Sequence, residues 1–138
     1  MILTNEIKCN KGESKDAFVA KVIAISAKLG IKPNWLMVVM HNESGINAQI
    51  VNKQKGDSSD PYTRSAYRAT GLIQFMPTTA VWLGTSTQAL YKMTNLEQLD
   101  YVYKYFKGFA GKIKSYFDLY MITFFPVAVG KPDDFVIQ

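Results

Sequence analysis

Hydrophobic residues recur at helical spacing along most of the chain, whereas alternating strand patterns are scarce. The first such segment can be capped by Ser14 and stops at Gly30, so it predicts one amphipathic helix. A second helix is expected from Pro33, which suits a first helical turn, to about residue 43, and Gly45 can end it. The pattern therefore predicts a mainly α fold in which each helix buries an apolar stripe.

Similar start and stop signals mark the rest of the chain. They predict one element that begins at Gly71, a short helix over residues 78–83, a helix opened by Thr94 and Glu97 at capping-box spacing, and a last helix over residues 119–125 opened by Ser115 and Asp118. Residues 47–70 lack periodicity and are rich in Asn, Ser, Asp, Lys and Gly. We expect this stretch to form a long loop or a small hairpin.

Length and composition predict a single domain over residues 1–138, because 138 residues with 48% hydrophobic content suffice for one core and leave little for a second. The longest apolar runs fall well short of the roughly 20 residues that cross a bilayer, so no membrane span is expected. The N-terminus lacks the apolar segment and cleavage site of a secretory signal, which predicts synthesis in the cytoplasm without a signal peptide.

Charge and the few metal-binding side chains narrow the choice of partners. The formal charge of +5 favours polyanions in general, but the lysines are scattered and no base-stacking motif accompanies them, so nucleic acid is not an expected partner. His41 is the single histidine and Cys9 the single cysteine. They lie far apart in sequence, so neither a metal site, a Cys/His nucleophile pair nor any cofactor is expected.

Glu43 is placed unusually, in the last turn of the expected helix that carries the apolar run WLMVVM at residues 35–40. The negative end of the helix dipole and the apolar neighbours both disfavour the charged carboxylate, which predicts a raised pKa. An acid that stays protonated near neutral pH can protonate the leaving oxygen in glycoside cleavage. The plainer interpretation is a glutamate that frays into solvent at a helix end, and position by itself does not separate the two.

Two motifs accompany this glutamate. ESG at 43–45 is followed by Asn47 and Ala48, and GLIQFMPTTA stands at 71–80. In this order they resemble the lysozyme-like lytic transglycosylases of the SLT type, which are related in fold to goose-type lysozyme. The resemblance implies a lysozyme-like (SLT-type) helical domain whose partner is the glycan strand of peptidoglycan. It also implies a catalytic role for Glu43 and substrate-binding roles for Ser44, Gly71, Gln74 and Met76.

The second motif has a physical interpretation of its own. Gly71 would let the backbone pass close to the sugar or to Glu43, and Gln74 could hydrogen-bond the glycan. Tyr101 and Tyr105 share one helix face, and we expect them to be an exposed pair that stacks on sugar rings.

The chain departs from the family pattern in three places. Gly71 follows Glu43 by 28 residues (71 − 43), longer than usual, and the added stretch supplies Asp57 and Asp60. Where relatives carry Tyr-Asn-Ala-Gly, this chain reads TFFPVAVG, with Phe124 and Phe125 in place of the polar pair, so the family's tyrosine helper cannot be assigned. The ending FPVAVGKPDDF resembles lysozyme-like modules of phage tail proteins, which suggests a part of a larger virion or secretion assembly that acts at the cell wall.

These departures leave several functions open. Lytic transglycosylation needs one acid/base glutamate, because the sugar's own groups close a 1,6-anhydro ring on MurNAc, and it is the preferred prediction. An inverting hydrolase instead needs a base carboxylate about 6.5 to 9.5 Å from the acid, which Asp57 or Asp60 could supply, although aspartates in such a stretch are commonly turn residues. A third alternative is a module that binds peptidoglycan or supports a virion without cutting anything.

Overall fold

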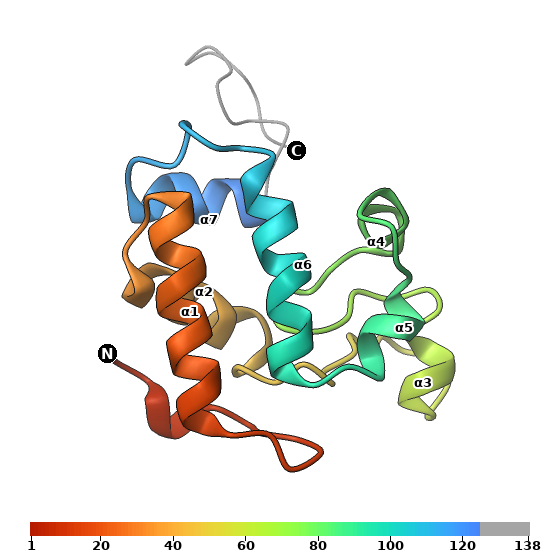
Figure 1. Cartoon of the computed structure of the whole chain (residues 1–138). Helices are drawn as coiled ribbons and strands as arrows, with labels where there is room; N and C mark the ends of the chain where they lie inside the picture. The colour runs from red at the N-terminus through yellow and green to blue at the C-terminus, as the bar shows by residue number, and fades with distance from the viewer. Residues whose placement is uncertain (125–138) are drawn as a thin grey trace.

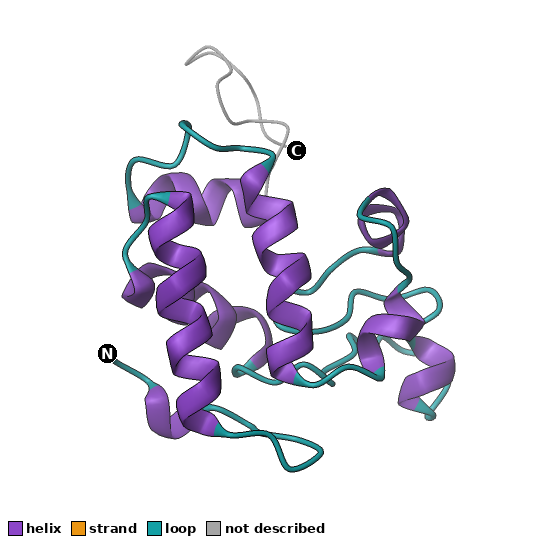
Figure 2. Ribbon diagram, in the orientation of Figure 1, coloured by secondary structure: helices purple, strands orange, loops and turns teal. Residues whose placement is uncertain are grey.

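The computed structural model describes residues 1–124, in which helices are joined by loops (Figure 2). The helices in chain order are a 3₁₀ turn η1 (Thr4–Glu6), α1 (Lys15–Leu29), α2 (Pro33–Ser44), α3 (Pro61–Arg64), α4 (Pro77–Trp82), α5 (Thr87–Tyr91), α6 (Asn95–Lys107) and α7 (Tyr116–Phe124). Within these residues β structure is confined to two isolated antiparallel bridges, Val51 with Thr70 and Thr70 with Phe75. The predicted mainly α class is confirmed.

The larger lobe is built from four helices around one hydrophobic core. In Figure 1, α1 and α6 stand beside each other, and α1 also packs on α2, which in turn packs on α7. The stripe predicted for the first helix is buried, as are core residues of the other three. These buried side chains include Phe18, Val22, Ile25, Leu29, Leu36, Met40, Leu99, Val102, Phe106, Leu119 and Ile122.

The predicted helix caps are present as hydrogen bonds. The Ser14 hydroxyl accepts from the Ala17 amide at 3.2 Å, and Thr94 and Glu97 form a complete capping box at the start of α6. The Ser115 hydroxyl accepts from the Asp118 amide at 3.1 Å. These short-range signals fix where α1, α6 and α7 begin.

A smaller lobe holds α3, α4 and α5, on the right of Figure 1, with the loop of residues 47–70. Helix α5 touches both α3 and α4. The long loop was expected, but α3 inside it and α5 after it were not. Each is about one turn long, too short to show a helical period, and each is capped by a side chain, Asp60 for α3 and Ser86 for α5.

The element expected at Gly71 is a closed turn and not a helix. Thr70 and Phe75 exchange backbone hydrogen bonds at 3.0 and 2.9 Å, and the Gln74 amide donates to the Gly71 carbonyl at 3.0 Å. Gly71 and Gln74 both have positive φ, 91° and 56°, which reverses the chain within four residues. We call residues 70–75 the motif turn.

Within the described part of the chain, no single helix is both long and apolar enough to cross a membrane. Helices α1 and α2 pass that test as a pair, by length and composition, but they are bent by 115° at the break between them.

Candidate active site

The last turn of α2 is held in a fixed conformation by the residues that follow it. Gly45 has a left-handed backbone (φ 67°) and donates its amide to the His41 carbonyl at 2.9 Å. The next amide, of Ile46, donates to the Met40 carbonyl at 3.2 Å, and the Ile46 side chain is fully buried. Glu43 is therefore carried on a helix end that cannot fray freely.

Burial changes the acidity of the Glu43 carboxyl. The side chain is partly buried, and loss of solvation raises its pKa from 4.5 to about 7. No hydrogen bond or ion pair engages this carboxylate within residues 1–124. A large share of Glu43 is therefore protonated at neutral pH, and its proton is available to a ligand.

Ser44, next in sequence, joins α2 to the motif turn. Its hydroxyl lies 2.9 Å from the Leu72 carbonyl oxygen and 3.1 Å from that of Met40, and it accepts from the Asn47 amide at 3.2 Å. The side chain is buried. With its one proton directed to backbone carbonyls, Ser44 positions the turn beside Glu43. The substrate-binding role that the family resemblance implies for Ser44 stays a prediction.

Gly71 makes a close approach, but to a side chain of α6. A Cβ built on Gly71 would lie 2.3 Å from the amide oxygen of Gln98. That oxygen accepts from the Leu72 amide at 2.9 Å, and the Gln98 amide nitrogen donates to the Ala48 and Leu90 carbonyls at 2.8 and 2.7 Å. The fully buried Gln98 thus joins three chain segments near the site.

Gln98 is a positioning residue that sequence reasoning missed. The available signal is that Gln98 lies on the same helix face as Leu99 and Val102, where an apolar residue would be expected. A polar residue on a core face commonly holds buried backbone groups together.

Gln74 and Met76 line a cavity of about 120 Å³ between the motif turn, α4, α6 and α7. The Gln74 amide nitrogen donates to the Ile50 and Gly71 carbonyls at 3.1 and 3.2 Å, which leaves its oxygen available within the described residues. Met76 is 55% exposed. Glu43 itself is not part of this lining, and it is connected to the cavity through Ser44 and the motif turn.

The expectation that Tyr101 and Tyr105 form an exposed pair is wrong. Tyr105 is 8% exposed, and its hydroxyl donates to the Ile122 carbonyl at 2.7 Å because α7 covers that part of α6. Burial raises the pKa of its phenol to about 12. Tyr101 is partly exposed, with the Lys104 ammonium 5.0 Å from its ring centre. Tyr105 nevertheless lines the cavity.

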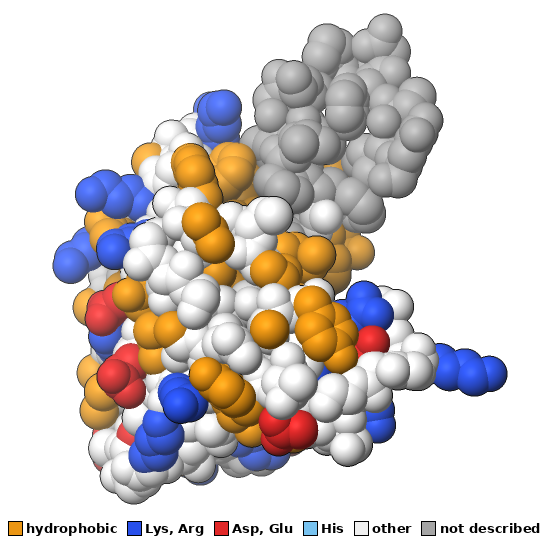
Figure 3. All heavy atoms as spheres, turned by 90° about the vertical axis from the view of Figure 1, so that its right-hand side faces the viewer, with side chains coloured by type: hydrophobic (Ala, Val, Ile, Leu, Met, Phe, Trp, Pro, Cys, Tyr) orange, Lys and Arg blue, Asp and Glu red, His pale blue; other side chains and the backbone are white. Residues whose placement is uncertain are grey.

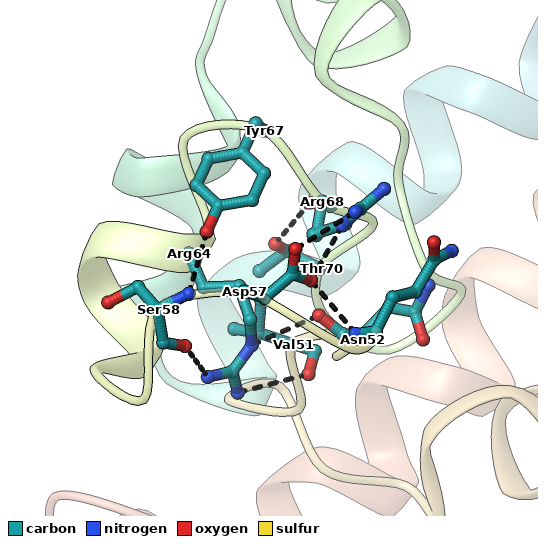
Figure 4. Close-up of polar contacts among 9 residues, drawn as sticks. Val51, Asn52, Asp57, Ser58, Arg64, Tyr67, Arg68 and Thr70 are labelled. Carbon is teal, nitrogen blue, oxygen red and sulfur yellow. Dashed lines mark hydrogen bonds and ion pairs between the residues drawn. The ribbon is translucent and has the colours of Figure 1, made fainter.

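The two aspartates of the long loop serve as structural anchors. Asp57 accepts from Nε and Nη2 of Arg68 at 2.7 and 2.9 Å and from the Gln54 amide at 2.8 Å (Figure 4). The hydrogen bonds from Arg68 hold the pKa of Asp57 down to about 2. Asp60 caps α3 through Thr63, and the hydrogen bond from the Thr63 hydroxyl lowers its pKa as well.

Arg64 fixes the same loop from inside. It is 8% exposed and donates to the carbonyls of Asn52, Ser58 and Val51 at 3.0, 2.9 and 3.3 Å (Figure 4). The polar residues of the long loop are thus largely occupied with holding its shape. Sequence composition predicted a loop here but gave no sign of this arginine network.

Two further predictions concern residues at or beyond the end of the described chain. Phe124 ends α7 and lines the cavity, while Phe125 and the ending FPVAVGKPDDF lie outside the described residues. Within residues 1–124, no three His, Cys, Asp or Glu side chains gather into a group that could hold a metal ion.

Comparison with known proteins gives one match. A sequence model described as the Transglycosylase SLT domain matches residues 21–113, which include Glu43 and the whole 71–80 motif. No curated protein and no solved structure matches the chain.

Proposed function

From the premise that the chain belongs to the Transglycosylase SLT domain family, we propose that it cuts the MurNAc–GlcNAc β-1,4 bond with Glu43 as general acid and base. Members of this family are lytic transglycosylases, so the chain is an enzyme of peptidoglycan cleavage that acts on the cell wall. The identity of the catalytic residue and of the product is the part that we propose.

The reaction needs one carboxyl group in two states. Protonated Glu43 gives its proton to the glycosidic oxygen, which leaves with the electron pair of the bond to C1 of MurNAc. The Glu43 carboxylate then takes the proton from the C6 hydroxyl of the same MurNAc as that oxygen bonds to C1. The product is a 1,6-anhydro ring, no water is consumed, and Glu43 ends protonated as it began.

The observation that carries this proposal is the contrast between Glu43 and the aspartates. The pKa of Glu43 is raised by burial to about 7, so the acid and base forms are both populated near neutral pH. Asp57 and Asp60 have lowered pKa values and direct their oxygens to Arg68 and Thr63. A hydrolase that used either as its base would have to release it from these partners, which favours the one-carboxylate route.

Digestion of purified peptidoglycan tests the proposal, with released fragments identified by mass spectrometry. The chain should release fragments with anhydro-MurNAc ends, and Glu43→Gln should release none. Reducing ends, heavier by one water, would make the protein a hydrolytic lysozyme, and Asp57→Asn and Asp60→Asn would then identify the base. Intact peptidoglycan with both proteins would leave a module that binds the wall without cutting it.

Delivery by a larger virion or secretion assembly is a separate proposal. It is supported by the resemblance of the ending FPVAVGKPDDF to phage tail modules. Detection of the chain in purified particles, at a fixed ratio to a structural protein of the particle, would support it. Its absence from every particle fraction would contradict it.

A further inference from the structure

Trp82, in the last turn of α4, is far more exposed than tryptophan usually is. It is 75% exposed, and its neighbour Val81 is 69% exposed. Figure 3 looks onto the end of the molecule that carries α3, α4 and α5, where hydrophobic side chains lie at the surface among polar ones. Tryptophan is enriched at binding interfaces, so an exposed ring of this size is a candidate for a binding site.

The ring of Trp82 borders a groove that continues the cavity beside the motif turn. This groove section has a volume of about 290 Å³ and is lined by Thr78, Thr79, Trp82, Tyr105 and Phe109. Thr79 and Tyr105 also line the cavity that holds Gln74 and Met76. The two hollows share these residues, so they are adjoining sections of one groove.

Helical spacing explains the two walls of this section. Thr78 and Trp82 are four residues apart and lie on one face of α4, while Val81 is turned away from the groove. Tyr105 and Phe109, also four apart, form the opposite wall at the end of α6. One section of the groove therefore combines a flat aromatic ring, two further rings and two hydroxyls.

This combination suits a sugar strand better than a purely apolar partner. A pyranose presents C–H groups on its faces, which pack against an aromatic ring, and hydroxyls at its rim, which side chains such as Thr78 can hydrogen-bond. Ligand sites are typically apolar and aromatic with a few polar groups of this kind.

We propose that Trp82 is a stacking platform for a sugar of the glycan strand at a distance from the bond that is cut. The inference rests on the proposed function, because it takes the groove that passes Gln74 and Met76 to be the glycan groove. Long strands would reach Trp82 while their scissile bond lies at Glu43, and short fragments would not. Trp82 would thus determine a preference for strand length without taking part in the chemistry.

Kinetics on two substrates tests this assignment. With long glycan strands freed of stem peptides by an amidase, Trp82→Ala should lower kcat/KM about tenfold, mainly through KM. With a tetrasaccharide the loss should be absent, and Trp82→Phe should restore most of the activity on long strands. Val81→Ala is the matched control and should behave as the original protein on both substrates. Equal activity of Trp82→Ala and Val81→Ala on long strands would overturn the proposal.

Fluorescence gives a readout that does not require cleavage. Trp35 and Trp82 are the two tryptophans, so the double variant Trp35→Phe/Glu43→Gln reports on Trp82 alone. Long glycan strands should shift its emission to shorter wavelength. A shift in this variant, when the parent protein with Glu43 also leaves peptidoglycan intact, would overturn the catalytic proposal and keep the platform. An unmoved emission, in a protein whose parent cuts peptidoglycan, would keep the enzyme and overturn the platform.

Discussion

Glu43 and Asp57 lie in two regions that shift the pKa of a carboxyl group in opposite directions. At the end of α2, Glu43 is partly buried without a hydrogen-bond partner in residues 1–124, and its pKa rises to about 7. In the long loop, the Asp57 side chain is 7% exposed but lies against Arg68, and its pKa falls to about 2. Burial without a partner produces a reactive acid, and burial with one produces a structural anchor.

The supports of the two regions also differ. The surroundings of Glu43 are fixed by helix-end geometry, the Ser44 hydroxyl and the Gln98 amide, and within residues 1–124 none of these hydrogen-bonds the carboxylate. The long loop is fixed by two charged side chains, Arg64 and Arg68. Arg64 donates to backbone carbonyls, and Arg68 forms an ion pair with the Asp57 carboxylate. Neutral supports hold Glu43 in place without lowering its pKa, as an acid catalyst requires.

Replacing the carboxylate of Glu43 or of Asp57 by an amide should give the largest difference in cleavage rate between the two regions. Glu43→Gln should lower the rate of fragment release from peptidoglycan by about 1,000-fold or more, because no proton donor remains. Asp57→Asn should stay within about threefold of the original rate, since its loss weakens a loop contact only. Comparable losses in both variants would mean that the loop aspartate shares in the chemistry.

Adding a methyl group at Gly71 tests how strongly the Gln98 side chain holds the region around Glu43. Gly71→Ala would place a Cβ 2.3 Å from the buried Gln98 amide oxygen at a positive φ, and we expect a loss of about 3 kcal/mol in the free energy of unfolding. Gly84→Ala is the matched control, with a φ of 87° and nothing within 4 Å, and should cost about 1 kcal/mol. Urea denaturation of both variants measures the difference. Equal losses would show that φ strain, and not Gln98, explains the glycine.

The raised pKa of Glu43 predicts a stability cost that grows with pH. Below about pH 4.5 the carboxyl is protonated in the folded and unfolded chains, so Glu43→Gln should match the original protein. Between pH 4.5 and about 7 the unfolded chain ionises first, which favours unfolding. At pH 8 the amide variant should therefore be more stable by about 2 kcal/mol. A stability difference between the variant and the original protein that is the same at pH 4 and at pH 8 would contradict the burial argument.

Asp57 should show the opposite dependence with a smaller effect. Its lowered pKa means that its contribution to stability is complete above pH 3.8 and is lost as the pH falls toward 2. Asp57→Asn should lower the melting temperature at pH 7 by roughly 2 to 4 °C. The deficit should shrink as the solution is acidified, and a deficit that grows in acid would show that the pair with Arg68 is not its source.

The sequence predicted those features that depend on neighbouring residues. Caps at Ser14, Thr94 and Ser115 and the stop at Gly45 are local signals, and the unusual position of Glu43 followed from them. The rise of its pKa was predicted from the helix dipole and apolar neighbours, and in the structure burial of the side chain is its cause.

Features set by distant contacts were missed or misassigned. The Gln98 side chain accepts a hydrogen bond from Leu72, 26 residues away, and the Tyr105 hydroxyl donates to Ile122, 17 residues away. No neighbouring residue in the sequence indicates either contact. The motif turn was expected as an element of unspecified type. The hydrogen bonds that close it are local, but the Ile50 carbonyl and the Gln98 side chain, which hold it in place, are distant in sequence. Trp82 could be identified as aromatic, but its exposure depends on the packing of α4.

The central claim, that burial makes Glu43 an acid active near neutral pH, can be tested by following its carboxyl carbon in an NMR titration. Glu6, Glu13, Glu43 and Glu97 are the four glutamates, and the signal missing from Glu43→Gln assigns the one of interest. The account predicts a titration midpoint of about 7 for this signal. A midpoint near 4.5, the value of a solvated glutamate, would contradict it.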